Sequence, residues 1–332
     1  MRHSGGARCL QGCQRRADRG GRHRSQDRGE IVMALSIGFV GIGNMGWPMA
    51  ARLVAAGYPV AVLDASEERM AAFGAEFGAR STASAEELAR DADVLITIVP
   101  TSAVVEQVLT AERGALRALR PGSIVIDMSS GIPAETIRLA GSVAAAGAAM
   151  IDAPVSGGVR RAVTGDLAIM AGGDDATIDR VMPVLSAMGS TVTRTGGIGS
   201  AHAMKALNNL VSAAGLLASV EALLIGQKFG LDPALMVDVL NASTGMNNST
   251  QKKLKPFVLS RTFDSGFGLD LMVKDLRIAL GVARESGTAA PFSALCQELF
   301  AAAAASLGPG RDHTELARFS EALGGAQLGD KG

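Results

Sequence analysis

Short apolar runs alternate with amphipathic segments between residue 33 and about residue 195. The runs that we interpret as strands lie at residues 35–40, 59–63, 93–99, 123–127, 149–152, 167–171 and 191–194. Strands that alternate with helical segments are typical of βα units, which build a parallel sheet with helices on both faces. The pattern therefore predicts an α/β fold with a mainly parallel sheet.

Near residue 195 the pattern changes, and the rest of the chain is typical of helices separated by short breaks. The breaks lie at residues 230–233, 244–251, 264–268 and 308–311. In the stretch 200–229 the only full charges are Lys205, Glu221 and Lys228, and a helix that is apolar nearly all round is expected to be buried. We predict an α/β domain at residues 33–195 and an all-helical domain at residues 196–332, joined through this long helix.

The net charge of zero over 332 residues hides a basic N-terminal segment. Residues 1–32 hold eight arginines and three acids with almost no apolar periodicity, so we expect a disordered or non-native extension ahead of Met33. The rest of the chain carries 24 basic and 29 acidic residues, which argues against a nucleic-acid-binding surface.

Cysteine usage and hydropathy limit the classes further. Cys9, Cys13 and Cys296 are too few and too unevenly spaced for a disulfide framework, and no paired Cys or His follows for a metal site. No run of about 20 apolar residues lacks a polar interruption, so no membrane span is predicted. We expect a cytoplasmic protein without a metal ion.

A glycine turn follows the first predicted strand. Gly41, Gly43 and Gly46 have the GxGxxG spacing and lead into an amphipathic segment that ends near Gly57. In a dinucleotide site the first glycine permits the turn, the second lets the backbone approach a pyrophosphate, and the third permits close helix packing. Backbone amides at the helix N-terminus then face the anion. The motif in this context predicts a dinucleotide cofactor.

The acid after the second strand bears on the choice of cofactor. Asp64 lies 23 residues after Gly41, about where a carboxylate takes the hydroxyls of the adenosine ribose. We therefore expect NAD, and NADP is disfavoured. The alternative is that Asp64 is a turn residue or helix N-cap and shares that role with Ser66.

Lys205 is the main candidate for proton transfer. It interrupts the long apolar helix, and burial would lower its pKa towards the neutral range. Asn208 and Asn209 follow three and four residues later, spacings that place side chains on one helical face. The alternative is a core lysine neutralised by an unseen carboxylate, or one that extends to water.

Four motifs in this order resemble the β-hydroxyacid dehydrogenases, a family that includes 3-hydroxyisobutyrate and tartronate semialdehyde-type enzymes. They are GFVGIGNMG at residues 38–46, DAPVSGG at 152–158, GIGSAHAMKALNN at 197–209 and VKDL at 273–276. The resemblance covers residues 33 to about 323. It implies a Rossmann domain followed by a helical domain, and an NAD-dependent oxidation of the CH–OH group of a small 3-hydroxy acid, or the reverse reduction.

The same resemblance implies roles for individual residues. Lys205 would be the general acid or base, and Asn209 would hold polar groups of the substrate beside it. Ser156, Gly157 and Gly158 would bind the substrate carboxylate, although the residues alone are typical of an ordinary turn. The residues implied at the cofactor are Gly41, Gly43, Asn44, Met45, Gly46, Asp64, Val99, Pro100, Thr101 and Lys274.

Two implied site residues have plain structural alternatives. Ser129 would contact cofactor and substrate, or it caps the helix that starts near Pro133. Lys274 would meet the cofactor, or it pairs with Asp275.

The determinants of the substrate are less specific. Arg160 and Arg161 would attract a small polar acid, or they are solvated. His202 would tune Lys205 one turn later, or it is simply packed. Residues 241–250 are polar and turn-rich, which is typical of a specificity loop and also of an interhelical connector. His313 is expected at the start of a terminal helix.

Three rival functions remain. The 6-phosphogluconate dehydrogenases share the cofactor turn and the lysine helix but carry a histidine where this chain has Asn208. Imine reductases typically replace the lysine. A non-catalytic NAD(P)-binding or scaffolding protein would not need both Lys205 and Asn209.

So apolar a helical half also predicts self-association, and the resemblance implies a homodimer or homotetramer.

Overall fold

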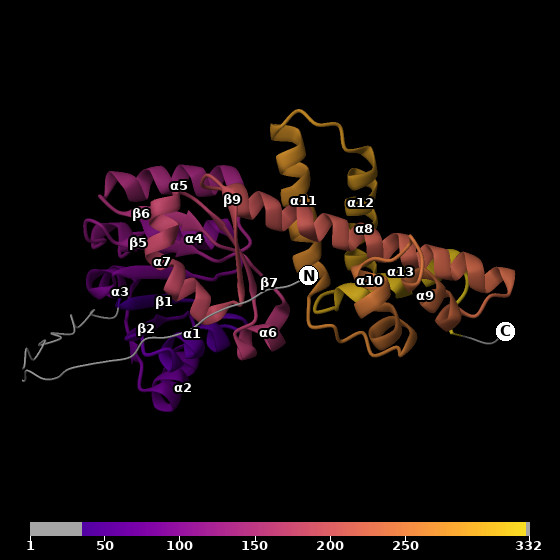
Figure 1. The fold of residues 1–332 in the computed structure, drawn as a ribbon, viewed down its shortest axis with the longest axis horizontal. Helices are drawn as coiled ribbons and strands as arrows, with labels where there is room; N and C mark the ends of the chain where they lie inside the picture. Colours follow the sequence, from indigo (N-terminus) through magenta and orange to yellow (C-terminus); the bar gives the residue numbers. More distant parts are fainter. Residues whose placement is uncertain (1–34, 330–332) are drawn as a thin grey trace, which may run out of the picture. The chain divides into compact units, whose positions relative to one another are not determined.

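The computed structural model describes residues 35–329, which lie within one compact unit, Ala34–Gly332. The extension predicted at residues 1–32 lies outside the described residues. Within the unit, a sheet with its covering helices extends to Gly196, and helices make up the rest from Ser200 (Figure 1). The boundary between residues 33–195 and 196–332 stays a prediction, because both parts belong to the same compact unit.

Nine strands of the described residues form one sheet, in the order β3-β2-β1-β4-β5-β6-β8-β7, with β9 paired to β8. The strands from β3 through β6 run parallel, whereas β8 is antiparallel to both β6 and β7. The bounds are β1 (Ile37–Val40), β2 (Val60–Leu63), β3 (Arg80–Ser81), β4 (Val94–Thr97), β5 (Ile124–Asp127), β6 (Ala149–Asp152), β7 (Val155–Ser156), β8 (Ala168–Gly172) and β9 (Thr191–Gly196). This is the dinucleotide-binding order, in which ligands bind at the carboxyl ends of the strands near the switch between β1 and β4.

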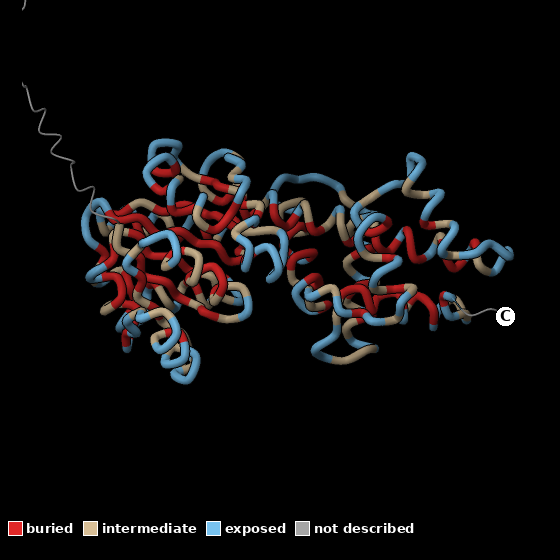
Figure 2. The backbone as a smooth tube through the Cα atoms, turned by 60° about the horizontal axis from the view of Figure 1, so that its bottom comes forward, coloured by how far each residue is buried: buried red, intermediate tan, exposed pale blue. Residues whose placement is uncertain are grey.

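Helices cover both faces of this sheet because alternate strand residues point to opposite sides. Phe39 and Ile96 pack with α1 (Gly46–Ala55), α2 (Glu67–Phe77) and α7 (Asp175–Met188). Leu95 and Val125 pack with α3 (Ala85–Asp91), α4 (Ser102–Thr110) and α5 (Pro133–Ala145) on the other side. Figure 2 shows the buried strands between these partly exposed helices. The predicted α/β fold with a mainly parallel sheet is confirmed.

Helix α8 (Ser200–Phe229) matches the long helix predicted at residues 200–229. Gly199 and Gly230, which flank it, have φ values of 86° and 102°, a backbone region that favours glycine. Its first turns contact β6, β8 and β9, and its later turns pack against the other helices. By length and composition α8 could cross a membrane, but 50% of its most apolar stretch is buried within the protein.

The remaining helices pack around α8 through a core that includes Leu216, Val220, Leu276 and Phe300. Their bounds are α9 (Pro233–Asn241), α10 (Asn248–Lys252), η2 (Leu254–Leu259), α11 (Leu269–Glu285), α12 (Pro291–Leu307), η3 (His313–Glu315) and α13 (Leu316–Gly324); η1 (Ala115–Arg117) and α6 (Gly158–Thr164) belong to the sheet half.

The break predicted at residues 244–251 is wrong in its second half, because α10 begins at Asn248. Asn247 and Thr250 form a capping box that satisfies the first amides of this short helix. Asn, Ser and Thr bond to nearby backbone in turns as well as at helix starts, so their sequence pattern does not separate the two.

Candidate active site

The glycine turn between β1 and α1 has the three properties that the motif predicts. Gly41 has a φ of 93°, and a Cβ there would lie 2.3 Å from the carbonyl oxygen of Ile98. A Cβ on Gly46 would lie 1.8 Å from the carbonyl oxygen of Gly41, so the helix start packs directly on the strand end. A Cβ on Gly43 would meet nothing closer than 3.9 Å. Open space at the second glycine fits a group that approaches the backbone from outside.

At the start of α1 the amide of Gly46 donates to no described residue and is available to an anion, whereas the amide of Trp47 donates to the carbonyl oxygen of Gly43 and Pro48 has no N–H. The N-cap residue is Met45, which makes no side-chain cap, and the first turn contains no acid. Amides at a helix N-terminus without a side-chain acceptor bind anions such as a pyrophosphate. The turn from Gly41 to Gly46, with Asn44 and Met45 inside it, therefore fits a dinucleotide cofactor.

Asp64 lies next to this turn and holds it in place. Its Oδ2 accepts a hydrogen bond from the backbone amide of Ile42 at 2.8 Å, and its Oδ1 accepts one from the amide of Ser66 at 2.9 Å. Asp64 therefore acts as a turn residue, which is the structural alternative given above, and Ser66 is the residue that caps α2. Each carboxylate oxygen can accept a further hydrogen bond, so a ribose contact is compatible with this geometry.

The turns after β4 and β5 are joined by Ser129. Its Oγ accepts a hydrogen bond from the amide of Val99 at 3.0 Å, and its own amide donates to Oδ1 of Asp127 at 3.0 Å. Ser129 does not cap α5, whose N-cap residue is Ile132. Thr101 caps α4.

Lys274 links these two turns to α11. Its Nζ donates to the carbonyl oxygens of Pro100 and Ser130, each at 3.2 Å, and lies 3.5 Å from Oδ1 of Asp275. Lys274 therefore pairs with Asp275, which is the structural alternative given above for this residue. It also attaches the helical half to the edge of the sheet. Val99, Pro100, Thr101, Ser129 and Lys274, all predicted site residues, are brought together here.

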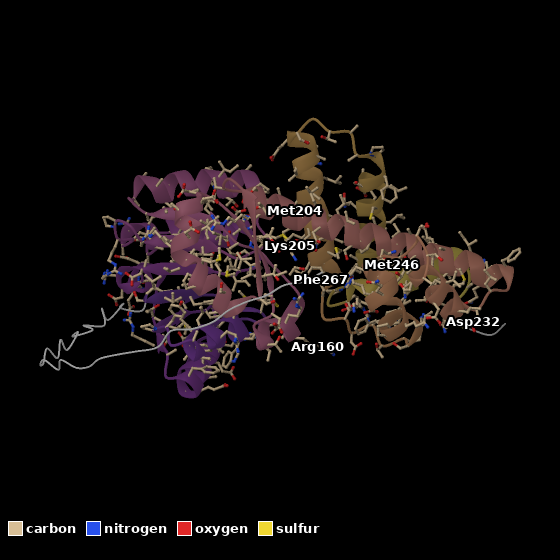
Figure 3. All side chains as sticks on the ribbon, viewed as in Figure 1. Arg160, Met204, Lys205, Asp232, Met246 and Phe267 are labelled. Atoms are coloured by element: carbon tan, nitrogen blue, oxygen red, sulfur yellow. The ribbon has the colours of Figure 1, made fainter. Side chains whose placement is uncertain are left out.

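Lys205 is buried, with 8% of its surface exposed, on the part of α8 nearest the sheet (Figure 3). Burial lowers the pKa of Lys205; Asp275 opposes this by attraction, and Lys274 reinforces it by repulsion. Within the described residues, no hydrogen bond or ion pair occupies Nζ of Lys205. Asp275 is the carboxylate that the alternative interpretation requires. It attracts the ammonium group of Lys205 without forming an ion pair with it, so the amine stays available.

Asn209 lies one turn after Lys205 and is also buried. Its Nδ2 donates to Oδ2 of Asp275 at 2.5 Å, and its Oδ1 accepts from Nδ2 of Asn208 at 3.2 Å. Sequence reasoning did not assign Asp275 to the site. The available signal was an acid two residues after Val273 and directly before Leu276, on the buried side of an amphipathic helix.

The turn implied to bind the substrate carboxylate joins β7 to α6. Gly157 and Gly158 have φ values of 133° and 69°, and Ser156 is half-buried at the end of β7. Arg160 and Arg161 are exposed, and a Cβ on Gly157 would lie 2.7 Å from Cδ of Arg161. Within residues 35–329, no hydrogen bond links this turn to α8, so its role in the site stays a prediction.

A second group of residues missed by sequence reasoning surrounds His202. This histidine is packed, which is the plainer of the two interpretations, and its ring lies near two buried acids at the ends of β5 and β6. Asp152 accepts hydrogen bonds from the amides of Gly199 and His202 and so caps α8. Burial raises the pKa of Asp152, while His202 and these amides oppose the rise.

Two family models match consecutive parts of the chain. The model described as the NAD binding domain of 6-phosphogluconate dehydrogenase matches residues 36–197. The model described as NAD-binding of NADP-dependent 3-hydroxyisobutyrate dehydrogenase matches residues 199–320. The two matches meet between β9 and α8, where the sheet ends and the long helix begins.

Several characterised proteins are similar over most of their length. The chain is 35% identical to 2-(hydroxymethyl)glutarate dehydrogenase from Eubacterium barkeri over 84% of this chain and 92% of that protein. It is 35% identical to 2-hydroxy-3-oxopropionate reductase from Escherichia coli K12 over 89% of this chain and 100% of that protein. Human mitochondrial 3-hydroxyisobutyrate dehydrogenase is 35% identical over 78% of this chain and 77% of that protein.

Solved structures agree with these matches. The Mycobacterium tuberculosis 3-hydroxyisobutyrate dehydrogenase with L-serine has a TM-score of 0.80 and 33% identity, over 87% of this chain and 99% of that one. Psf3 in complex with NADP+ and 2-OPP has a TM-score of 0.75 and 30% identity, over 86% and 99%. An imine reductase from Myxococcus stipitatus, at 18% identity and a TM-score of 0.60 over 87% and 100%, shares the fold. Together these similarities show that the chain belongs to the β-hydroxyacid dehydrogenases, oxidoreductases with nicotinamide-dinucleotide-binding domains.

Proposed function

We propose that this protein oxidises a small 3-hydroxy acid with NAD, or reduces the corresponding semialdehyde or keto acid, and that Lys205 carries the proton. The observation that carries the proposal is a buried lysine with a lowered pKa, whose amino group has no hydrogen bond or ion pair with the described residues, and Asn209 one turn away. A general acid or base works best when its pKa lies near the operating pH.

The cofactor would be held by residues of the sheet edge. The turn from Gly41 to Gly46 would take the pyrophosphate, Asp64 the adenosine ribose, and the turn at residues 99–101 with Lys274 the nicotinamide end. When bound, NAD supplies the acceptor of the hydride. Asp64 supports NAD over NADP, because its carboxylate would repel a 2′-phosphate.

Backbone amides and side chains of the site would bind the substrate, orient its hydroxyl and transfer the proton. Backbone amides at Ser156, Gly157 and Gly158 would bind the substrate carboxylate, which fixes the reacting carbon. Asn209 would orient the hydroxyl, with its own position set by Asp275. Neutral Lys205 would accept the hydroxyl proton during oxidation and return it during reduction. The rate of oxidation should therefore rise with pH through the pKa of Lys205, which burial holds below its ordinary value.

The substrate class follows from the named relatives. 3-Hydroxyisobutyrate, 2-(hydroxymethyl)glutarate and 2-hydroxy-3-oxopropionate are short acids with a hydroxyl or carbonyl on the carbon β to a carboxylate. A phosphosugar substrate is disfavoured because Asn208 stands where the 6-phosphogluconate enzymes have histidine. A non-catalytic role is disfavoured by the retained amine of Lys205.

Initial rates test the proposal. The protein would be assayed with NAD and NADP separately against 3-hydroxyisobutyrate, 3-hydroxypropionate, 2-(hydroxymethyl)glutarate, glycerate, threonate and 4-hydroxybutyrate. Lys205→Ala should abolish turnover and leave NAD binding intact. Lys252→Ala is the matched control, because Lys252 is exposed on α10 and has no ion pair with a described residue. Lys205→Ala with most of its activity retained would refute the role of the lysine, and NAD binding without any turnover would favour a non-catalytic protein.

Self-association is part of the same proposal. Met204, Leu207 and Val211 are exposed on α8 at spacings of three and four residues, which place them on one face. An exposed apolar stripe of this kind supports a homodimer or homotetramer. Light scattering of the protein and of Val211→Glu would test it, and a monomeric parent protein would contradict it.

A further inference from the structure

Helix α8 is attached to the sheet by Asp152, the last residue of β6. Its N-cap residue, Gly199, has no side chain to cap the first turn. Asp152 replaces that cap, since its Oδ1 accepts from the amide of Gly199 at 2.7 Å and its Oδ2 from the amide of His202 at 2.8 Å. The position of the helix that carries Lys205 therefore depends on contacts at the ends of β5 and β6.

The ring of His202 fills the space at this junction. It is fully buried, and its Nδ1 shares a hydrogen bond of 2.8 Å with Oγ1 of Thr136 on α5. Nδ1 also lies 3.9 Å from Oδ2 of Asp152, and Nε2 lies 3.8 Å from Oδ2 of Asp127. Asp127 and Asp152 are direct partners in the parallel pairing of β5 with β6. The ring thus touches two strands, α5 and its own helix.

The same ring contacts the turn that follows β5. A Cβ on Gly131 would lie 2.7 Å from Cε1 of His202, so ring and turn are packed without spare space. Asp127 extends the connection, because its Oδ1 accepts from the amide of Ser129 at 3.0 Å and from Oγ1 of Thr97 at 2.9 Å. Ser129 then holds the amide of Val99. One imidazole therefore lies between the lysine helix and the two turns implied to contact the cofactor.

The electrostatics of the junction give the ring a second function. The side chains of Asp127 and Asp152 are 3% and 0% exposed, and among the described residues His202 is the only basic group within ion-pair distance of either. Buried carboxylates without a compensating group are strongly destabilising. An apolar residue at position 202 would leave both acids their hydrogen bonds from hydroxyl and amide groups. It would remove the basic group that attracts Asp152, and the first turn of α8, which Asp152 caps, would move with this acid.

We propose that His202 is a positioning residue: it sets the separation between the first turn of α8 and the turn at residues 129–131, and so places Lys205 against the reacting group. His202 precedes Lys205 by three residues, so the two lie on adjacent turns of the same helix side. The proposal rests on the proposed function, because it assigns His202 a part in the reaction that Lys205 carries.

Three substitutions test it in the full chain. His202→Leu keeps most of the volume, and removes the hydrogen bond to Thr136 and the ring nitrogens that lie beside Asp127 and Asp152. Thr136→Val preserves the shape of α5 and removes the partner of Nδ1. It also removes the hydroxyl's bond to the carbonyl oxygen of Ile132, which still accepts from the amide of residue 136. His202→Asn is the conservative variant, because its amide can occupy the position of Nδ1 and keep the bond to Thr136.

The expected result is a loss in kcat with little change in KM. A displacement of about 1 Å at a catalytic group costs up to about 100-fold, so His202→Leu should lose roughly 10- to 100-fold in kcat and Thr136→Val a smaller factor. His202→Asn should recover most of the loss. NAD affinity, read from the fluorescence of the single tryptophan Trp47 beside the glycine turn, should change less than kcat.

A purely structural role predicts a different outcome. It would lower the Tm of His202→Leu and leave kcat of the folded protein within about twofold, and that result would overturn the proposal. If His202→Leu does not fold, Thr136→Val decides, because it keeps the ring and both acids. Failure of the proposed function would be visible separately, as a parent protein that binds NAD and turns over no hydroxy acid. In that case a crystal structure of Thr136→Val would test the positioning role of His202. A displaced Lys205 amine would support it, and an unchanged position would overturn it.

Discussion

Asn209 on α8 donates a hydrogen bond from Nδ2 to Oδ2 of Asp275 on α11 over 2.5 Å. Both side chains are buried, with 7% and 1% of their surfaces exposed. Asp275 follows Lys274, whose amine binds the carbonyl oxygens of Pro100 and Ser130. The helix that carries Lys205 and the turns at the sheet edge therefore share α11 as a common support.

Asp275→Asn should lower the pKa of Lys205 further. The carboxylate of Asp275 attracts the ammonium and holds this pKa up against burial, so its neutralisation favours the neutral amine. We expect the acid limb of kcat/KM for oxidation to move to lower pH. The measurement is the pH profile of kcat/KM. Asp270→Asn, at an exposed acid in the first turn of α11, is the control and should leave the profile unchanged. A shift to higher pH would contradict the electrostatic role of Asp275.

The glycine turn offers two substitutions that should both weaken NAD binding but differ in their effect on stability. Gly46→Ala places a Cβ 1.8 Å from the carbonyl oxygen of Gly41, so it should lower the Tm by several degrees and abolish NAD binding. Gly43→Ala has space within the protein, with Arg69 at 3.9 Å as the nearest neighbour. It should keep the Tm and weaken NAD binding by about tenfold or more, because the methyl group occupies the space of the pyrophosphate.

Thermal denaturation and NAD titration separate the two effects. Trp47 follows Gly46 directly and stacks edge-on against Phe73 at 5.0 Å, so its fluorescence reports on the turn. Equal Tm values for both variants would show that the third glycine is not required for packing.

The extent of α8 could be predicted from the sequence because its signals are local. A continuous apolar stretch lies between Gly199 and Gly230, and both glycines adopt the left-handed conformation that ends or precedes a helix. The glycine turn was predictable for the same reason, because its three glycines lie within one stretch of six residues that joins a strand to a helix.

The supports of the site could not be predicted, because they depend on contacts between distant segments. Asp275 bonds to Asn209 across 66 residues, and Asp152 caps Gly199 across 47 residues. Periodicity of 3.6 or 2 residues carries no information about such pairs. Ser129 shows the limit clearly: whether it caps α5 or holds Val99 is decided by the register of β4 with β5, in which Thr97 pairs with Asp127.

Asp64→Ser should shift the cofactor preference towards NADP. The substitution removes the negative charge that would oppose a 2′-phosphate. Arg69 in the first turn of α2 lies close by, with one guanidinium nitrogen 3.4 Å from the carbonyl oxygen of Ile42, and can pair with the phosphate. A charge-assisted hydrogen bond contributes about 1.5–3 kcal/mol, so the ratio of kcat/KM for NADP to that for NAD should rise by roughly 10- to 100-fold.

Initial rates with both cofactors measure this ratio. The double variant Asp64→Ser with Arg69→Gln is the control, since it removes the cation as well and should lose most of the gain with NADP. An unchanged ratio in Asp64→Ser would show that Asp64 serves only the turn, through its bonds to Ile42 and Ser66.

Stability should fall as the pH decreases from about 6.5 to about 4 because of His313. Burial lowers the pKa of this histidine to about 4, with repulsion from Lys253 as a second cause. The unfolded chain takes up a proton at the ordinary value near 6.5. Between these values the unfolded state binds more protons than the folded state, so protons favour unfolding and stability is fully present only above about pH 6.5. We expect a loss of about 1–3 kcal/mol over this window. Urea denaturation at pH 7, 6, 5 and 4.5 measures it, and His313→Gln should flatten the dependence; an equally steep loss in that variant would assign it to other groups.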